Sequence, residues 1–75
     1  MKNEALISAR KRKGLSQEQL AEMLGVRKTT ISNWENSYSN PTLSDAFRVA
    51  DILESDVNVL FSGLRVQEYH TKTTA

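Results

Sequence analysis

The chain contains no cysteine and only one histidine, His70, among its 75 residues. Disulfide bonds and thiolate metal sites are therefore excluded, and one imidazole in a polar segment cannot build a metal cage by itself. We accordingly expect no cofactor. The longest apolar runs fall far short of the roughly 20 residues that a membrane span needs, and no signal-peptide pattern precedes the first predicted helix. A cytoplasmic location is the resulting expectation.

Arrangements of residues typical of enzymes are also lacking. No paired carboxylates lie in a plausible cleft, no Cys or His nucleophile pair exists, and no Gly-rich phosphate loop is present. We therefore expect no enzyme. A chain of 75 residues forms one small domain and buries only about 60% of the surface that its unfolded form exposes. The core is therefore modest, and a partner subunit would add stability.

The formal net charge is only +1, but the charges are unevenly distributed along the chain. Residues 1–34 carry seven Lys and Arg against three Glu, a net charge of +4. Residues 35–64 carry one Arg against five acidic residues, a net charge of −4. Such a molecule would present its basic half to phosphate groups and its acidic half to solvent.

Apolar residues recur at helical spacing, and no run alternates with the period of two that is typical of a strand. Helices are predicted over residues 4–13, 17–24, 28–35, 43–53 and 57–61, with Asn3, Thr42 and Asp56 as caps of the first and the last two. The fourth should bury Leu43, Ala46, Phe47, Ala50 and Leu53. We expect an all-α domain over residues 1–64 and a polar, flexible tail over residues 65–75.

The most informative segment is residues 16–36, which predicts two short helices joined by a tight turn. Ser16, followed three residues later by Gln19, forms a capping box that begins the first helix. Gly25 can adopt the left-handed conformation that ends it, and Val26 fills the angle between the helices. The inward face of the first helix is expected to consist of Leu20, Ala21, Met23 and Leu24.

The second of these helices, residues 28–35, has one continuous polar face. At about 100° per residue, Ile31 and Trp34 point away from that face. The polar side chains fall within an arc of roughly 140°, which contains Lys28, Thr29, Ser32, Asn33 and Asn36. Because no acidic residue lies at its centre, this arc can approach base edges and phosphates without repulsion.

These features together resemble the lambda-repressor-like family, the Cro and Xre type of helix-turn-helix regulator. The resemblance covers about residues 4–61. It depends on Arg10 four residues before Gly14, GLSQEQLA from Gly14 to Ala21, Leu24 with Gly25, ISNWEN from Ile31 to Asn36, and Pro41 with Leu43. It implies a compact five-helix fold in which the second and third helices form the helix-turn-helix.

The resemblance also implies roles for individual residues. Lys28, Thr29 and Asn33 match positions that usually read bases, and Ser32 lies between them. Gln17 and Asn36 match phosphate-contacting positions. Arg10 and Glu35 match a partly buried salt bridge between the first and third helices, which would neutralise an acid close to the DNA.

Other residues beside the predicted DNA face have two open interpretations. Arg27 stands where a capping Ser or Thr is usual, so a capping bond is lost, but its cation could contact phosphate. Arg12 could approach the DNA backbone, whereas Lys11 and Lys13 in the same run favour a solvated helix end. Tyr38 either packs on its loop or touches the sugar-phosphate backbone.

Two turns depart from the family pattern. Ser37 and Glu54 occupy positions where glycine is usual, so each turn must adopt a less favourable backbone or another geometry. Ser55 stands where an apolar residue is usual.

Specific DNA reading by such modules usually requires a dimer on two half-sites about 34 Å apart. The candidates for a symmetric contact are Val57, Leu60, Phe61 and Leu64. For Leu60 and Phe61, closing the core of the single chain is an equal alternative.

The resulting hypothesis is a sequence-specific regulator that binds double-stranded DNA, a repressor of bacterial or phage type that acts as a homodimer on a palindromic operator. The alternative is an antitoxin or a regulator whose main partner is another protein, bound through the last two helices or the tail.

Overall fold

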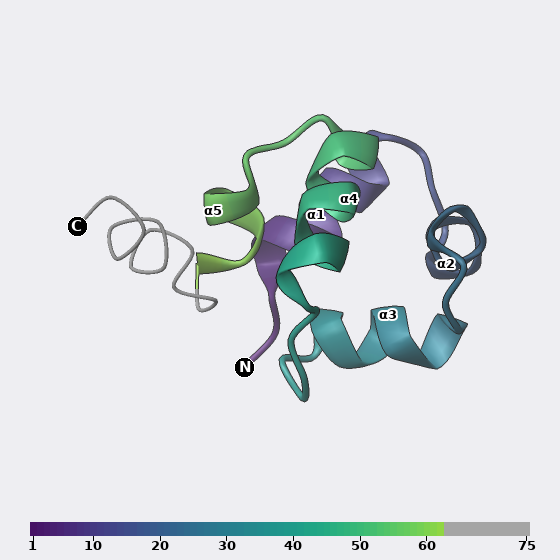
Figure 1. Ribbon diagram of the computed structural model, residues 1–75, viewed down its shortest axis with the longest axis horizontal. Coiled ribbons are helices and arrows are strands. Elements are labelled where there is room, and N and C mark those ends of the chain that lie inside the picture. The colour runs from purple at the N-terminus through teal and green to yellow at the C-terminus, as the bar shows by residue number, and fades with distance from the viewer. Residues whose placement is uncertain (63–75) are drawn as a thin grey trace.

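A computed structural model describes residues 1–62 of the chain, and within them every regular element is a helix. The elements are α1 (Glu4–Arg12), α2 (Gln17–Leu24), α3 (Lys28–Glu35), α4 (Leu43–Leu53) and α5 (Val57–Leu60). In Figure 1, α1 and α4 lie above α3, and α2 lies beside the right-hand end of α3. Helix α5 lies to the left of α1 and α4, on the side opposite to α2. The predicted all-α fold is confirmed. The predictions for Leu64 and for residues 65–75 fall outside the described residues.

Side-chain caps explain where most of these helices begin. The oxygen of a capping side chain accepts a hydrogen bond from a backbone N–H in the first turn, which satisfies a group that the helix itself leaves unpaired. The caps are Asn3 for α1, Ser16 for α2, Thr42 for α4 and Asp56 for α5. At Ser16 both bonds of the predicted capping box are present. Arg27 gives α3 no side-chain cap, as its residue type predicts.

One apolar core receives side chains from all five helices. Its members are Leu6, Ala9, Leu20, Ala21, Leu24, Ile31, Trp34, Ala46, Val49, Ala50, Leu53, Val57, Leu60 and Phe61. Trp34 of α3 meets Phe61 edge to face, with ring centroids 6.4 Å apart and planes at 84°. This geometry is favoured because the positive edge of one ring faces the negative face of the other. The buried side of the predicted DNA-reading helix is therefore fixed to the end of α5.

The predicted inward faces of α2 and α4 are wrong at one position each. Met23 is 53% exposed, since Leu20, Ala21 and Leu24 already fill the contact of α2 with its neighbours. Phe47 is 52% exposed, whereas Val49, which was not predicted, is fully buried. The buried stripe of α4 is thus rotated relative to the prediction. It faces both α2 and α5, since α4 packs between them.

Three of the four residues proposed for a dimer contact lie in the core of the single chain, and the fourth, Leu64, is outside the described residues. Val57, Leu60 and Phe61 are 9%, 1% and 4% exposed. For Leu60 and Phe61, this burial agrees with the alternative in which they close the core. A symmetric contact on α5 would have to use their neighbour Val59, which is 62% exposed.

Hydrogen bonds of Asn3 connect the two ends of the described chain. Its backbone N–H donates to the carbonyl oxygen of Glu35 at 2.7 Å, and its side-chain Nδ2 donates to the carbonyl oxygen of Leu60 at 2.7 Å. The start of α1 is thereby joined to the ends of α3 and α5. Within residues 1–62, none of the helices has the length and apolar character that crossing a membrane requires.

Candidate nucleic-acid interface

Helix α3 lies along one edge of the molecule, with one side toward the other helices (Figure 1). Ile31, Trp34 and Glu35 are buried. Lys28, Thr29 and Asn33 are exposed, and Ser32 is half-buried beside them. The structure therefore brings the four side chains predicted to read bases onto one face of one helix, supported from behind by the core.

The turn between α2 and α3 places the start of α3 at the surface. Gly25 ends α2 in the left-handed conformation, with φ 74° and ψ 29°, which a residue with a Cβ adopts at a cost. Val26 is half-buried and packs against the core. Arg27 follows in extended conformation and is exposed. Its guanidinium is thus available beside the free N–H groups of the first turn of α3.

A network around Glu35 fixes the other end of α3. Arg10 Nε donates to Glu35 Oε2 at 2.6 Å and Arg10 Nη2 donates to Glu35 Oε1 at 3.3 Å. The exposed fractions of the two side chains are 11% and 4%. Arg10 Nη1 also donates to the carbonyl oxygen of Leu15 at 2.8 Å. This fork geometry, with both charges paired, holds α1, the loop before α2 and α3 in one arrangement.

Gln17, predicted to contact phosphate, belongs to the same network. Its Nε2 donates to Glu35 Oε1 at 2.9 Å, and the side chain is only half-buried. An amide group has two N–H donors, so one remains for a ligand. The contact between Gln17 and Glu35 was missed in the sequence, because the resemblance paired Glu35 with Arg10 alone.

Asn36, the second residue predicted to contact phosphate, is also hydrogen-bonded within the protein. Its Nδ2 donates to the carbonyl oxygen of Ser32 at 3.0 Å and to Ser32 Oγ at 3.3 Å. Because Ser32 Oγ accepts this bond, its own hydroxyl hydrogen is left to donate elsewhere. These contacts order the last turn of α3 on its polar side.

The other two residues predicted to approach phosphate are exposed. Arg12 lies in the last turn of α1. Tyr38 is 79% exposed, which does not match the alternative of packing on its loop. The loop turns sharply before it, since Ser37 has a φ of 62°. Lys13, in contrast, binds Glu54 at 2.7 Å and pairs the end of α1 with the end of α4.

Comparison with known families agrees with this geometry. A helix-turn-helix family model matches residues 6–60, which cover the five helices except the first two residues of α1. The chain belongs to this helix-turn-helix family. The resemblance drawn from its sequence motifs is thereby confirmed.

Several curated relatives are similar to this chain. Antitoxin HipB of Escherichia coli K12 is 38% identical over 50 residues, which are 67% of this chain and 57% of HipB. The transcriptional activator BcrR of Enterococcus faecalis is 38% identical over 61 residues, 81% of this chain and 30% of BcrR. Antitoxin HigA1 of Mycobacterium tuberculosis H37Rv is 35% identical over 68 residues, 91% of this chain and 46% of HigA1. The matches thus span from under a third to somewhat over half of these relatives. No solved structure gives a significant match.

Proposed function

We propose that this protein is a transcriptional regulator that binds double-stranded DNA and reads its sequence with α3. The observation that carries the proposal is the open polar side of α3, presented by a helix whose other side is anchored in the core by Ile31 and Trp34. A rigid helix with short polar side chains and a basic residue near its amino end fits the major groove. The family membership supports the same function.

The base contacts follow from the chemistry of the exposed side chains. Lys28 can donate to guanine O6 and N7, and Asn33 can form a paired contact with adenine N6 and N7. Thr29 can meet a thymine methyl group or a polar base edge. Ser32 acts as a donor in this arrangement, because its oxygen already accepts from Asn36.

The phosphate contacts are proposed at both ends of α3. At its start, Arg27 offers a cation that no acid within residues 1–62 pairs. At its end, Gln17 retains one amide N–H beyond the one bound to Glu35. Asn36 donates to both Ser32 O and Ser32 Oγ, so it would exchange one of these bonds for a phosphate oxygen. Arg12 and Tyr38 would add contacts to the flanking backbone. Such contacts fix the register of the protein on DNA but carry no sequence information.

We further propose that two copies act on a palindromic site as a repressor. One α3 reads only a few base pairs, so a dimer on half-sites about 34 Å apart would supply the missing specificity. The exposed Val59 marks the side of α5 available for such a contact. A regulator that covers a promoter represses it, which is the simplest action for a domain of this size.

Selection of bound duplexes from a random pool tests the proposal. The full chain should enrich one consensus, and its two halves should be related by a two-fold axis. The matched control is an Asn33→Ala, Lys28→Ala variant, which should enrich no such consensus because two proposed base contacts are removed. Its fold should be kept, because both residues are exposed and lie outside the core. A pool that stays random for the unaltered chain contradicts the proposal. A single, asymmetric consensus contradicts only the dimer.

A second candidate function is that of an antitoxin, a regulator whose main partner is another protein. The observation in its favour is that the relatives HipB and HigA1 are named antitoxins. Under this alternative the DNA face would be kept, and the partner would bind elsewhere, on α4 and α5 or on residues 65–75. Deletion of residues 65–75 separates these partner sites, because DNA affinity should survive while capture of a tail-bound partner should fail.

A further inference from the structure

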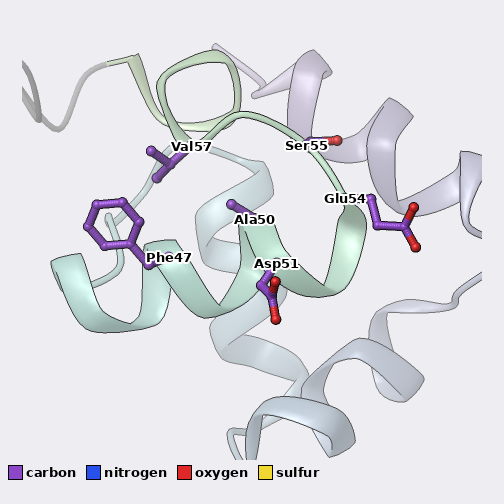
Figure 2. Close-up of a pocket in the computed structure, with 6 residues that line it drawn as sticks. All are labelled: Phe47, Ala50, Asp51, Glu54, Ser55 and Val57. Carbon is purple, nitrogen blue, oxygen red and sulfur yellow. The ribbon is translucent and has the colours of Figure 1, made fainter.

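A groove lies between α4 and the segment that leads into α5, and its residues are shown in Figure 2. Phe47 and Val57 form one end, Glu54 and Ser55 lie at the other, and Ala50 and Asp51 lie between them. Its lining comes only from α4, α5 and their connection, so it shares no residue with α2 or α3. A ligand bound here would therefore leave the proposed DNA-reading side chains uncovered.

The groove carries an apolar surface that the core leaves unused. Phe47 is 52% exposed, although it lies in the middle of a helix whose other large apolar residues are buried or half-buried. Ala50 and Val57, at 7% and 9% exposed, form the floor beside it. A single exposed apolar side chain is ordinary, but an exposed aromatic ring at the end of a groove is a typical anchor point for a partner.

Both charged side chains that line the groove are acidic and lie at the carboxyl end of α4, where Glu54 is paired with Lys13 of the α1 end. The carboxyl end of a helix has a partial negative charge, which favours Lys, Arg or His in the last turn. The last turn of α4 has no basic residue and contains Asp51 instead. Asp51 makes no ion pair with any residue between 1 and 62. Within residues 1–62, Lys13 pairs Glu54, and Asp51 is left as the acid of this helix end without a cation.

Glu54 is a second unfavourable feature at the carboxyl end of α4, because of its backbone conformation. It is the residue after α4 and adopts the left-handed conformation, with φ 52° and ψ 48°, which glycine would adopt without strain. Its carboxylate is bound by Lys13 at 2.7 Å but remains exposed. Sequences that break local rules of stability tend to do so at functional sites. Here three such features, the exposed ring, the acid in the last turn and the strained acidic residue, line one groove.

We propose that this groove binds a segment of a partner protein in which a Lys or Arg stands beside a large apolar residue. The cation would lie at the carboxyl end of α4 against Asp51, beside the Glu54 carboxylate that Lys13 already binds. The apolar side chain would lie on Phe47, Ala50 and Val57. This ligand supplies the positive charge that the last turn of α4 lacks and covers the ring that the core leaves exposed.

Selection of random 12-residue peptides displayed on phage against the immobilised full chain, without DNA, tests this proposal. Enriched peptides should carry Lys or Arg beside a large apolar residue, and a synthetic peptide of the consensus should bind less tightly as salt rises. The Phe47→Ser, Asp51→Lys variant should bind that peptide about tenfold more weakly or worse. The Asp51→Lys variant alone should lose part of the affinity although it keeps the fold, because it alters an exposed side chain and places a favourable cation in the last turn of α4.

The matched control is Glu22→Lys with Met23→Ser on α2. It makes the same change of charge and removes an apolar side chain that is 53% exposed, close to the 52% of Phe47. It should bind the peptide as the unaltered chain does. Absence of enrichment, a consensus without Lys or Arg, or equal loss in the control would overturn the proposal. Displacement of the peptide by a second copy of the chain or by a peptide of residues 63–75 would also overturn the proposal, because the groove would then bind this chain and not a partner protein. None of these results depends on DNA binding.

Discussion

Arg10 and Glu35 form a nearly buried ion pair that joins α1 to the last residue of α3, with Arg10 Nε 2.6 Å from Glu35 Oε2. Gln17 donates to the other carboxylate oxygen, so three helices meet at one acidic group. The position of α3 relative to the rest of the domain therefore depends on a charged contact as well as on apolar packing. Removal of Glu35 alone should therefore lower the free energy of unfolding more than removal of both Arg10 and Glu35.

We expect Glu35→Ala to lower the free energy of unfolding by about 3 kcal/mol, because it leaves the Arg10 charge and the Gln17 amide without their partner. The double variant Arg10→Met, Glu35→Leu should lose clearly less, since it leaves no unpaired charge. Urea denaturation followed by circular dichroism measures both values. Glu22→Ala, at an exposed acid on α2, is the control and should change the value by no more than about 0.5 kcal/mol. A double variant as unstable as Glu35→Ala would contradict this interpretation.

We expect Ser37→Gly to raise the free energy of unfolding by about 0.5–1 kcal/mol, because Ser37 has a φ of 62°, which costs a residue with a Cβ more than it costs glycine. Ser8→Gly is the control, since Ser8 is exposed within α1 and the same change there should lower stability by about 0.5 kcal/mol. Thermal and urea denaturation give the two signs. Loss of stability in both variants would show that the turn carries no such strain.

The pair between Lys13 and Glu54 should make stability depend on acid pH. The hydrogen bond from Lys13, and then its charge, lowers the pKa of the Glu54 carboxyl from 4.5. A lowered pKa in the folded state means that this contribution is present above about pH 4.5 and is lost as the pH falls through the folded pKa. Carbon-detected NMR titration should show the Glu54 pKa move back toward 4.5 in Lys13→Gln. If the Glu54 titration curve is the same in Lys13→Gln as in the unaltered chain, the pair with Lys13 is not the cause of the lowered pKa.

The sequence predicts the helices well because their boundaries depend on local chemistry. The capping box at Ser16 and Gln19, the left-handed Gly25 and the missing cap at Arg27 are all present in the structure. The positive φ at Ser37 and Glu54 also agrees with the less favourable backbone expected where glycine is replaced.

The sequence does not predict which apolar side chains of a helix are buried, because their burial depends on the neighbouring helices. Phe47 and Val49 are both apolar and lie on opposite flanks of the apolar stripe of α4, at about 100° per residue. Which flank is buried depends on the helices that pack against α4, and the structure buries Val49 and leaves Phe47 exposed. The same holds for Leu60 and Phe61, whose place in the core depends on the packing of α5 against α1 and on the contact between Trp34 and Phe61. Periodicity identifies an apolar stripe but does not identify the elements that lie against it.

The residues of the proposed DNA face are predicted from the sequence in part. Spacing alone places Lys28, Thr29 and Asn33 on one side of a helix, and the structure leaves that side exposed. The hydrogen bonds of Gln17 to Glu35 and of Asn36 to Ser32 depend on three-dimensional neighbours and on side-chain conformations, and the sequence gives no signal for them.

Base reading by α3 is tested most directly by the affinities of two variants for the selected duplex and for a scrambled one. Asn33→Ala should lose about 1–3 kcal/mol on the selected duplex, relax the preference at one base position and leave the scrambled duplex unaffected. Arg27→Ala, at an exposed residue without a capping bond, should weaken binding to both duplexes alike. Equal losses on both duplexes for Asn33→Ala would contradict sequence reading by this helix.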